Sequence, residues 1–392
     1  MNHRIESMAP SASMVLMARA REMQKSDPTV IGLAGGEPDF ATPDRITMAA
    51  IRSMAEGYTH YVVGPGIPEL REAIQKKLLE ENGVRADPAQ ILLTPGGKNA
   101  IYLAIHAVLN EGDEVMVLDP AWVSYEPIIQ AAGGRTVKVK LDCRRDYRIT
   151  AEALERACTE RTRMLIINYP NNPTGRILHT DEADILEKFL LAHPEVYLLA
   201  DEIYERLVYD GKRSVSMGSR TSVRERVITV NGFSKSAAMT GWRIGYLAAN
   251  GEVFEAAYKL YQHSLSCISG FLQKGAVAAF QCQEEMEEMR RIYERRRNLF
   301  TGALNRIPGV RCTPPEGAFY AWVFFDFPGM DSVQMCEYLL ENAGVVGMPG
   351  SAYGEDSVCS MRFSFANATR DLEIAAERIT GALEKLRQGG KR

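Results

Sequence analysis

The sequence predicts an α/β protein in which helices cover both faces of a mostly parallel β-sheet, joined to a smaller α+β domain. From residue 91 onward, short apolar runs alternate with helical stretches, which is the pattern of parallel strands connected by crossover helices. The chain of 392 residues is also longer than one hydrophobic core usually serves. We therefore expect a large sheet domain and a second, smaller domain.

The N-terminal region is expected to form an arm and part of the small domain, over residues 1–50. The pattern predicts an arm over 1–27 with a short helix over 14–25, for which Ser11 or Ser13 is a possible N-cap. A loop rich in Gly and Pro follows at 33–40. Such a loop either turns the chain or lets its backbone approach a ligand closely.

Residues 51–269 are expected to form the large domain. A helix is predicted around 43–56, and turn residues at 58–71 lead into another helix. The apolar runs that we interpret as strands lie at 91–93, 114–118, 164–167, 196–200, 227–230 and 244–248.

Residues 270–392 are expected to form an interdomain helix and the C-terminal small domain. A long helical region is predicted at 270–307, and strands are predicted at 318–325 and 358–365. The last residues, 388–392, are expected to fray.

Composition narrows the classes of partner and compartment. The charges, 46 Lys and Arg against 50 Asp and Glu, sum to −4, so nucleic acid and anionic membranes are poor expected partners. The 7 cysteines are scattered and none forms a C-x-x-C pair, which indicates a reducing compartment and no metal site. No apolar run approaches the length of a membrane span, so we expect a soluble cytoplasmic protein.

The stretch 230–246 carries the most informative chemistry. An apolar strand runs into small polar residues that present Lys235 beside Ser234, and Arg243 follows before the next strand. A lysine on a tight turn at a strand end is held in a cleft, and an arginine nearby adds a fixed cation. This pair suits a cofactor with an aldehyde, which condenses with an amine, and a phosphate, which pairs with a guanidinium. Pyridoxal phosphate carries both groups.

Other predicted strands also end in residues that such a cofactor uses, and ligands gather at the carboxyl ends of parallel strands. Gly97 and Lys98 open a helix whose amides suit a phosphate, while Trp122 suits stacking on a ring. Asn172 and Tyr204 suit a phenolic oxygen. Asp201 follows an apolar run, where a carboxylate is costly unless it meets a cation such as a protonated pyridine. Four of these features have a structural alternative: an ordinary turn before a helix for Gly97, a core tryptophan for Trp122, a solvent turn for Asn172 and a helix N-cap for Asp201.

The motifs N-N-P-T-G, D-E-I-Y, S-K and G-W-R-I-G-Y occur in that order along the chain, and together they resemble the class I aminotransferases, fold type I of the pyridoxal-phosphate enzymes. The resemblance implies a large domain with a mostly parallel seven-stranded sheet. It also implies that Lys235 binds the cofactor aldehyde covalently, that Asp201 pairs with the pyridinium and that Trp122 stacks on the ring. Asn172 and Tyr204 would bind its phenolic oxygen.

The same resemblance assigns the remaining contacts. Those expected at the phosphate are Gly97, Lys98, Ser234 and Arg243, the first two through backbone amides, with Tyr61 reaching the phosphate of a partner subunit. This last role implies a homodimer with shared active sites. Arg362 would clamp the substrate α-carboxylate together with Asn172 and Trp122, under the loop that contains Gly36.

The implied activity is transamination by a ping-pong mechanism, in which Lys235 moves the substrate proton. A carbon–sulfur β-lyase of the same fold remains an alternative, whereas a regulator with this fold would need a DNA-binding domain that the short arm does not provide. The pattern looks closest to the prokaryotic-type aspartate aminotransferase subgroup, so aspartate is the best single expected substrate, with 2-oxoglutarate as acceptor. Aromatic amino acids and alanine stay open. Neither His106 nor His263 is assigned to the side-chain carboxylate, and residues 265–271 are expected to line the substrate pocket, either of their own subunit or of the partner.

Overall fold

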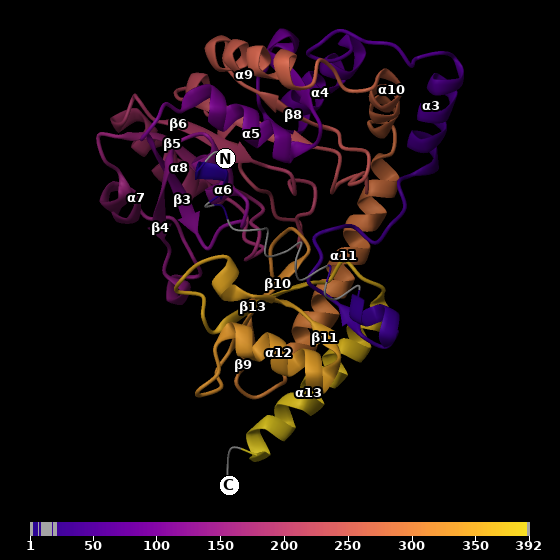
Figure 1. Ribbon diagram of the computed structural model, residues 1–392, viewed down its shortest axis with the longest axis vertical. Coiled ribbons are helices and arrows are strands. Elements are labelled where there is room, and N and C mark those ends of the chain that lie inside the picture. Colours follow the sequence, from indigo (N-terminus) through magenta and orange to yellow (C-terminus); the bar gives the residue numbers. More distant parts are fainter. Residues whose placement is uncertain (1–2, 7, 9–17, 19–21, 390–392) are drawn as a thin grey trace.

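The computed structural model describes residues 3–6, 8, 18 and 22–389 of the chain (Figure 1). Residues 22–26 are helical, as expected for the end of the predicted 14–25 helix. The remainder of that helix except residue 18, and its possible N-caps Ser11 and Ser13, lie outside the described residues.

The chain alternates strands and helices over most of its length. The strands are β1 (Ile31–Gly32), β2 (Ile91–Thr94), β3 (Glu114–Asp119), β4 (Arg135–Lys140), β5 (Thr162–Asn168), β6 (Tyr197–Asp201), β7 (Val227–Gly232), β8 (Gly245–Ala248), β9 (Val310–Cys312), β10 (Tyr320–Phe325), β11 (Val345–Val346), β12 (Met348–Pro349) and β13 (Ser360–Ser364). The α-helices are α1 (His3–Glu6), α3 (Asp44–Ala55), α4 (Pro68–Asn82), α5 (Gly97–Val108), α6 (Tyr125–Ala131), α7 (Ala151–Ala157), α8 (Thr180–Ala192), α9 (Gly251–Ser264), α10 (Gly270–Ala279), α11 (Gln283–Leu304), α12 (Ser332–Ala343) and α13 (Thr369–Gly389).

The large sheet has seven strands in the order β2-β8-β7-β6-β5-β3-β4. Its strands are parallel except β8, which runs antiparallel to both β2 and β7. The predicted seven-stranded, mostly parallel sheet is therefore confirmed. The sequence interpretation missed β4, because its alternation of Lys and Arg with Thr and Val is typical of an edge strand rather than of an apolar run.

Helices cover both faces of this sheet and bury alternate residues of each strand. On one face, α5, α6 and α9 pack on side chains such as Val117, Ile166 and Leu199. On the other face, α7 and α8 pack on Leu118, Leu165 and their neighbours. Because successive side chains of a strand point to opposite faces, a strand buried on both sides must be apolar throughout.

The C-terminal part contains an antiparallel sheet in the order β12-β13-β10-β9, with α11, α12 and α13 around it (Figure 1). The short parallel pair β1–β11 joins the N-terminal segment to this part. The predicted helical region 270–307 is two helices, α10 and α11, separated at residues 280–282. The domain boundaries after residues 50 and 269 remain a proposal.

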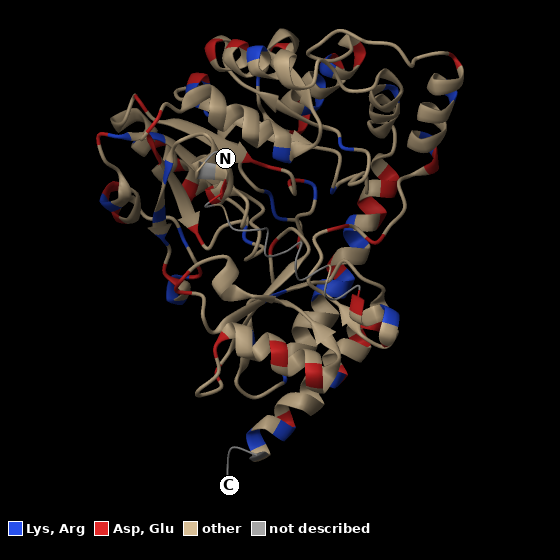
Figure 2. Cartoon of the chain, in the orientation of Figure 1, with Lys and Arg blue, Asp and Glu red and all other residues tan. Residues whose placement is uncertain are grey.

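Charged residues are interspersed over the helices, with acidic and basic positions often adjacent, as along α11 (Figure 2). Within the described part of the chain, no helix is both long and apolar enough to cross a membrane.

Candidate active site

A cavity of about 420 Å³ lies where the large sheet meets the C-terminal part. Most of the predicted site residues line it: Gly36, Gly97, Lys98, Trp122, Asn172, Asp201, Tyr204, Ser234, Lys235, Arg243 and Arg362. Tyr61 does not line the cavity, and it is 89% exposed. No residue of 265–271 is among the described residues that line this cavity.

Lys235 lies on the loop that connects β7 to β8. Its Nζ donates a hydrogen bond to the backbone carbonyl of Gly36 at 2.5 Å, which joins the loop to the N-terminal segment. Burial lowers the pKa of Lys235 to about 8, and the positive charges of Arg243 and Arg362 act in the same direction, while Glu37 opposes them. Roughly a tenth of the amine is therefore neutral, and so nucleophilic, at pH 7, far more than for an ordinary lysine.

Asp201 ends β6 and is buried beneath the cavity. One of its carboxylate oxygens accepts a hydrogen bond from the Tyr125 hydroxyl at 2.7 Å, and the other accepts from the Ile203 amide at 3.3 Å. Burial raises the pKa of Asp201 to about 6, against the lowering effect of these donors. The helix N-cap alternative is wrong, because residues 203–206 form a turn and no α-helix follows Asp201 there.

A pocket suited to an anion forms where β2 leads into α5 and where the β7–β8 loop ends. Gly96 has a φ of 79°, and a Cβ on Gly245 would stand 2.5 Å from the amide nitrogen of Gly97. These two positions need glycine, and they leave the first amides of α5 open to a ligand. The Arg243 guanidinium lies beside Gly96 and donates to the carbonyl of Thr240 at 2.8 Å. Buried Ser234 completes this end of the cavity.

Lys98 of α5 contributes both its backbone and its side chain to the cavity. Its backbone belongs to the first turn of the helix, while its Nζ lies 4.9 Å from the centroid of the Trp122 ring. No carboxylate partner for this amine is found among the described residues. The side chain therefore presents a cation to the cavity beyond the anion pocket.

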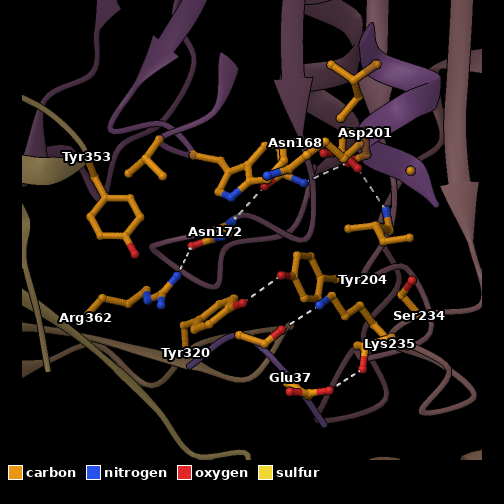
Figure 3. Close-up of a pocket in the computed structure, with 18 of the residues that line it drawn as sticks. Glu37, Asn168, Asn172, Asp201, Tyr204, Ser234, Lys235, Tyr320, Tyr353 and Arg362 are labelled. Atoms are coloured by element: carbon orange, nitrogen blue, oxygen red, sulfur yellow. Dashed lines mark hydrogen bonds between the residues drawn. The ribbon is translucent and has the colours of Figure 1, made fainter. Parts of the chain in front are cut away.

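Arg362 occupies the opposite side of the cavity, on β13 (Figure 3). It donates to Asn172 Oδ1 at 2.9 Å and to the carbonyl of Ala34 at 2.6 Å. Its guanidinium lies 4.2 Å from the ring centroid of Tyr320 and 5.1 Å from that of Tyr353. Two aromatic rings beside the guanidinium and two hydrogen bonds restrict its movement, and an arginine held in this way can bind a carboxylate through both of its outer nitrogens.

The sequence analysis missed several residues of the site. The Tyr125 hydroxyl donates a hydrogen bond to the Asp201 carboxylate. The hydroxyls of Tyr320 and Tyr204 are hydrogen-bonded to each other at 2.7 Å. Tyr353, Asn168 and Glu37 also line the cavity. Tyr125 follows Trp122 in the segment after β3, so its position at a strand end was a usable signal. Tyr353 and Tyr320 come from the C-terminal part, and no local pattern in the sequence places them at this cavity.

The donor set fits pyridoxal phosphate. A buried carboxylate suits a protonated pyridine nitrogen, a part-buried amine suits the aldehyde, and helix amides with a guanidinium suit the phosphate. Fold and site together are those expected of an α/β enzyme that holds a cofactor on a lysine and acts on substrates with a carboxylate.

Comparison with known proteins identifies the family. The family model "Aminotransferase class I and II" matches residues 28–379, and the chain belongs to this family. It is therefore a transaminase, and members of the family depend on pyridoxal phosphate.

The relatives support this assignment over the full length. The chain is 37% identical to an aspartate aminotransferase of Musicola paradisiaca, covering 97% of this chain and 96% of the relative. It is 38% identical to an aromatic-amino-acid aminotransferase of Thermococcus litoralis, covering 98% of each. The crystal structure of an aspartate aminotransferase from Rhizobium meliloti superposes with a TM-score of 0.92 at 37% identity, covering 97% of this chain and 98% of that one.

Proposed function

We propose that this aminotransferase binds pyridoxal phosphate and transfers the amino group of L-aspartate to a 2-oxo acid such as 2-oxoglutarate. The observation that carries the proposal is the placement of Lys235, an amine whose pKa is lowered to about 8, in one cavity with buried Asp201 and Arg362. An amine, an acid and a carboxylate-binding cation in this arrangement are what transamination of an amino acid requires.

The proposed cofactor contacts follow from the position of each group around the cavity. Lys235 would bind the aldehyde, Asp201 the pyridine nitrogen, and Asn172 and Tyr204 the phenolic oxygen. Trp122 would stack on the ring. The phosphate would take the amides of Gly97 and Lys98, the hydroxyl of Ser234 and the guanidinium of Arg243, with Tyr61 of a second subunit. When bound, pyridoxal phosphate supplies an aldehyde that condenses with amines and a ring that stores electrons.

The chain's own side chains then perform the remaining tasks. Arg362 binds and orients the substrate α-carboxylate, which fixes the Cα–H bond relative to Lys235. In the first half of the reaction, the neutral amine of Lys235 takes the proton from Cα of the amino acid. In the second half, the amine of Lys235 delivers a proton to Cα of the new amino acid. Because the amino acid must leave as its oxo acid before the second oxo acid enters the same cavity, ping-pong kinetics follow.

Aspartate is favoured because one cation that lines the cavity is needed neither for the cofactor phosphate nor for the α-carboxylate. Once Arg243 is given to the phosphate and Arg362 to the α-carboxylate, the Lys98 side chain remains for a side-chain carboxylate. Several relatives are named aspartate aminotransferases, which supports this choice. The aromatic rings of Trp122, Tyr320 and Tyr353 favour aromatic amino acids as the second candidate, in line with the relative of that name.

We further infer a cytoplasmic homodimer. Exposed apolar side chains of the N-terminal half, such as Tyr61, Val63 and Met48, offer a surface for a second copy, and Tyr61 would then act in the partner's site. All 7 cysteines are free, which suits a reducing compartment.

The visible absorbance of the purified protein tests the proposal. We expect a band of lysine-bound cofactor that bleaches with L-aspartate and returns with 2-oxoglutarate. A band that aspartate leaves untouched, but that phenylalanine bleaches, would replace aspartate by aromatic substrates. Release of ammonia and pyruvate from a sulfur amino acid without a second oxo acid would favour the β-lyase. No band after addition of pyridoxal phosphate would refute the role of Lys235.

A further inference from the structure

The hydroxyl of Tyr353 is buried at the cavity but unused. Tyr353 is 4% exposed, and its hydroxyl oxygen has no hydrogen-bond partner among the residues that the structure describes. The neighbouring Nε of Arg362 is also buried and unpartnered within the same described set. Leaving a buried polar group without a partner costs stability, so a buried hydroxyl of this kind in the wall of a cavity indicates a ligand that completes it.

The position of this tyrosine is fixed by contacts from both parts of the chain. Its amide donates to the carbonyl of Gly350 at 2.8 Å, and its own carbonyl accepts from the amide of Ala121, just after β3, at 2.9 Å. Its ring meets that of Trp322 edge to face, with centroids 5.7 Å apart. The ring therefore has little freedom to turn its hydroxyl elsewhere.

The hydroxyl points into the cavity, toward the pair formed by Asn172 and Arg362 (Figure 3). Burial raises the pKa of Tyr353, so the phenol stays protonated and remains a donor at neutral pH. The other tyrosine beside Arg362 is not available in the same way, because the hydroxyl of Tyr320 is already bonded to that of Tyr204.

We propose that Tyr353 donates a hydrogen bond to the substrate α-carboxylate that Arg362 binds, and so sets how tightly the enzyme holds every one of its substrates. A carboxylate has more acceptor sites than a guanidinium fork fills, and a neutral phenol beside the fork supplies a further donor without adding charge. The inference rests on the proposed function for the identity of the ligand. It assigns Tyr353 to the end that amino acids and oxo acids share, and not to their side chains.

The test compares Tyr353→Phe with the wild-type holoenzyme. The substitution removes the hydroxyl and keeps the ring against Arg362 and Trp322. We expect KM for both L-aspartate and 2-oxoglutarate to rise roughly tenfold, the typical loss of one hydrogen bond to a charged group, with kcat within about twofold. The thermal midpoint without ligand should stay equal or rise, because an unpartnered buried hydroxyl is lost.

Carboxylate binding without turnover gives the second readout. The thermal midpoint is followed against propanoate, a monocarboxylate, and against maleate, a dicarboxylate, with sodium chloride at matched ionic strength. Tyr353→Phe should weaken the stabilisation by both ligands by a similar factor. This measurement does not need transamination, so a wild-type protein that failed to bleach with any amino acid would refute the proposed function and leave the Tyr353 result interpretable.

Tyr261→Phe is the matched control. Tyr261 is a fully buried tyrosine whose hydroxyl also has no partner within the described residues, but it belongs to α9 and does not line the cavity. It should leave KM and ligand binding unchanged. Three results would overturn the proposal: unchanged KM and binding in Tyr353→Phe, an equal effect in Tyr261→Phe, or weakened binding of maleate alone, which would place the hydroxyl at the substrate side chain.

Discussion

The hydroxyl of Tyr125 donates a hydrogen bond to the carboxylate of Asp201 across 2.7 Å, and both residues are at least nine-tenths buried. Tyr125 stabilises the charged form of an acid whose pKa burial has already raised to about 6. The proposed pairing with a pyridine depends on the charge of Asp201. Tyr125 therefore influences this pairing from α6, none of whose residues lines the cavity.

Tyr125→Phe should move the acidic limb of the pH profile of kcat/KM to higher pH. Without the donor, the pKa of Asp201 rises above its present value, so the carboxylate is lost at a higher pH than in the wild type. Affinity for pyridoxal phosphate should fall roughly tenfold at pH 6 and less at pH 8. Tyr338→Phe, which removes a hydroxyl bonded to the Ala382 carbonyl in the C-terminal part, is the control and should change neither quantity. An unshifted limb in Tyr125→Phe would contradict the assignment.

Capture of pyridoxal phosphate by the apoenzyme should depend on the protonation of Lys235. Only the neutral amine condenses with the aldehyde, so the rate should rise with pH and reach half its maximum near the pKa of about 8. Glu37→Gln removes a negative charge that raises this pKa, and the midpoint should then fall below 8. Stopped-flow absorbance measures the rate, Lys235→Ala should abolish the signal, and exposed Lys188→Ala should leave it unchanged. A midpoint that Glu37→Gln moves upward would be inconsistent with the charge argument.

Lys98→Met should change specificity more than overall activity. If the side chain binds the distal carboxylate of aspartate, kcat/KM for aspartate falls roughly 10- to 100-fold, as expected for loss of a hydrogen bond between charged groups. The value for phenylalanine should change little. Steady-state kinetics on both substrates in the same variant provide the internal control. Equal losses for both would show that the Lys98 side chain serves the cofactor instead.

The buried ion pair of Arg176 and Glu182 should dominate the stability of the segment before α8. Glu182 is 0% exposed, and it accepts hydrogen bonds from Arg176 at 3.0 and 2.9 Å and from the amide of Ile149 at 2.8 Å. Removing one partner of such a pair strands a buried charge, so Glu182→Ala should lower the free energy of unfolding by about 3–5 kcal/mol.

The adjacent pair between Arg148 and Asp181 provides the control, because both side chains are exposed. Asp181→Ala should cost less than about 1 kcal/mol. Urea denaturation measures both variants. If the two substitutions had similar effects, burial would not be the cause. Partial recovery in the double variant Glu182→Ala with Arg176→Met would support it.

The strands could be predicted from the sequence wherever they are buried on both faces. Residues 164–167 are apolar without interruption, and 227–230 are apolar except for the buried Thr229, because helices cover both strands from both sides. The edge strand β4 has one less neighbour, carries charge and gave no such signal. The break at residues 280–282 between α10 and α11 was missed because no Gly or Pro marks it.

The site could be predicted on its large-domain side because parallel strands bring their carboxyl ends together. Asn168 at the end of β5 is in register with Asp201 at the end of β6, so two motifs far apart in the sequence meet without any tertiary information. Tyr320 and Tyr353 could not be placed this way. Their positions depend on how the C-terminal sheet docks on the large one, which no local pattern encodes. The roles of all these residues remain proposals.

The internal bonds of Arg362 also make it a filter for the shape of anions. Its two outer nitrogens already donate to Asn172 Oδ1 and to the carbonyl of Ala34. A ligand that displaces these oxygens must replace two acceptors at once. A carboxylate does so with its paired oxygens, whereas chloride offers a single centre and leaves one donor unsatisfied. Under the proposed function, abundant small anions would therefore compete poorly for the position assigned to the substrate α-carboxylate.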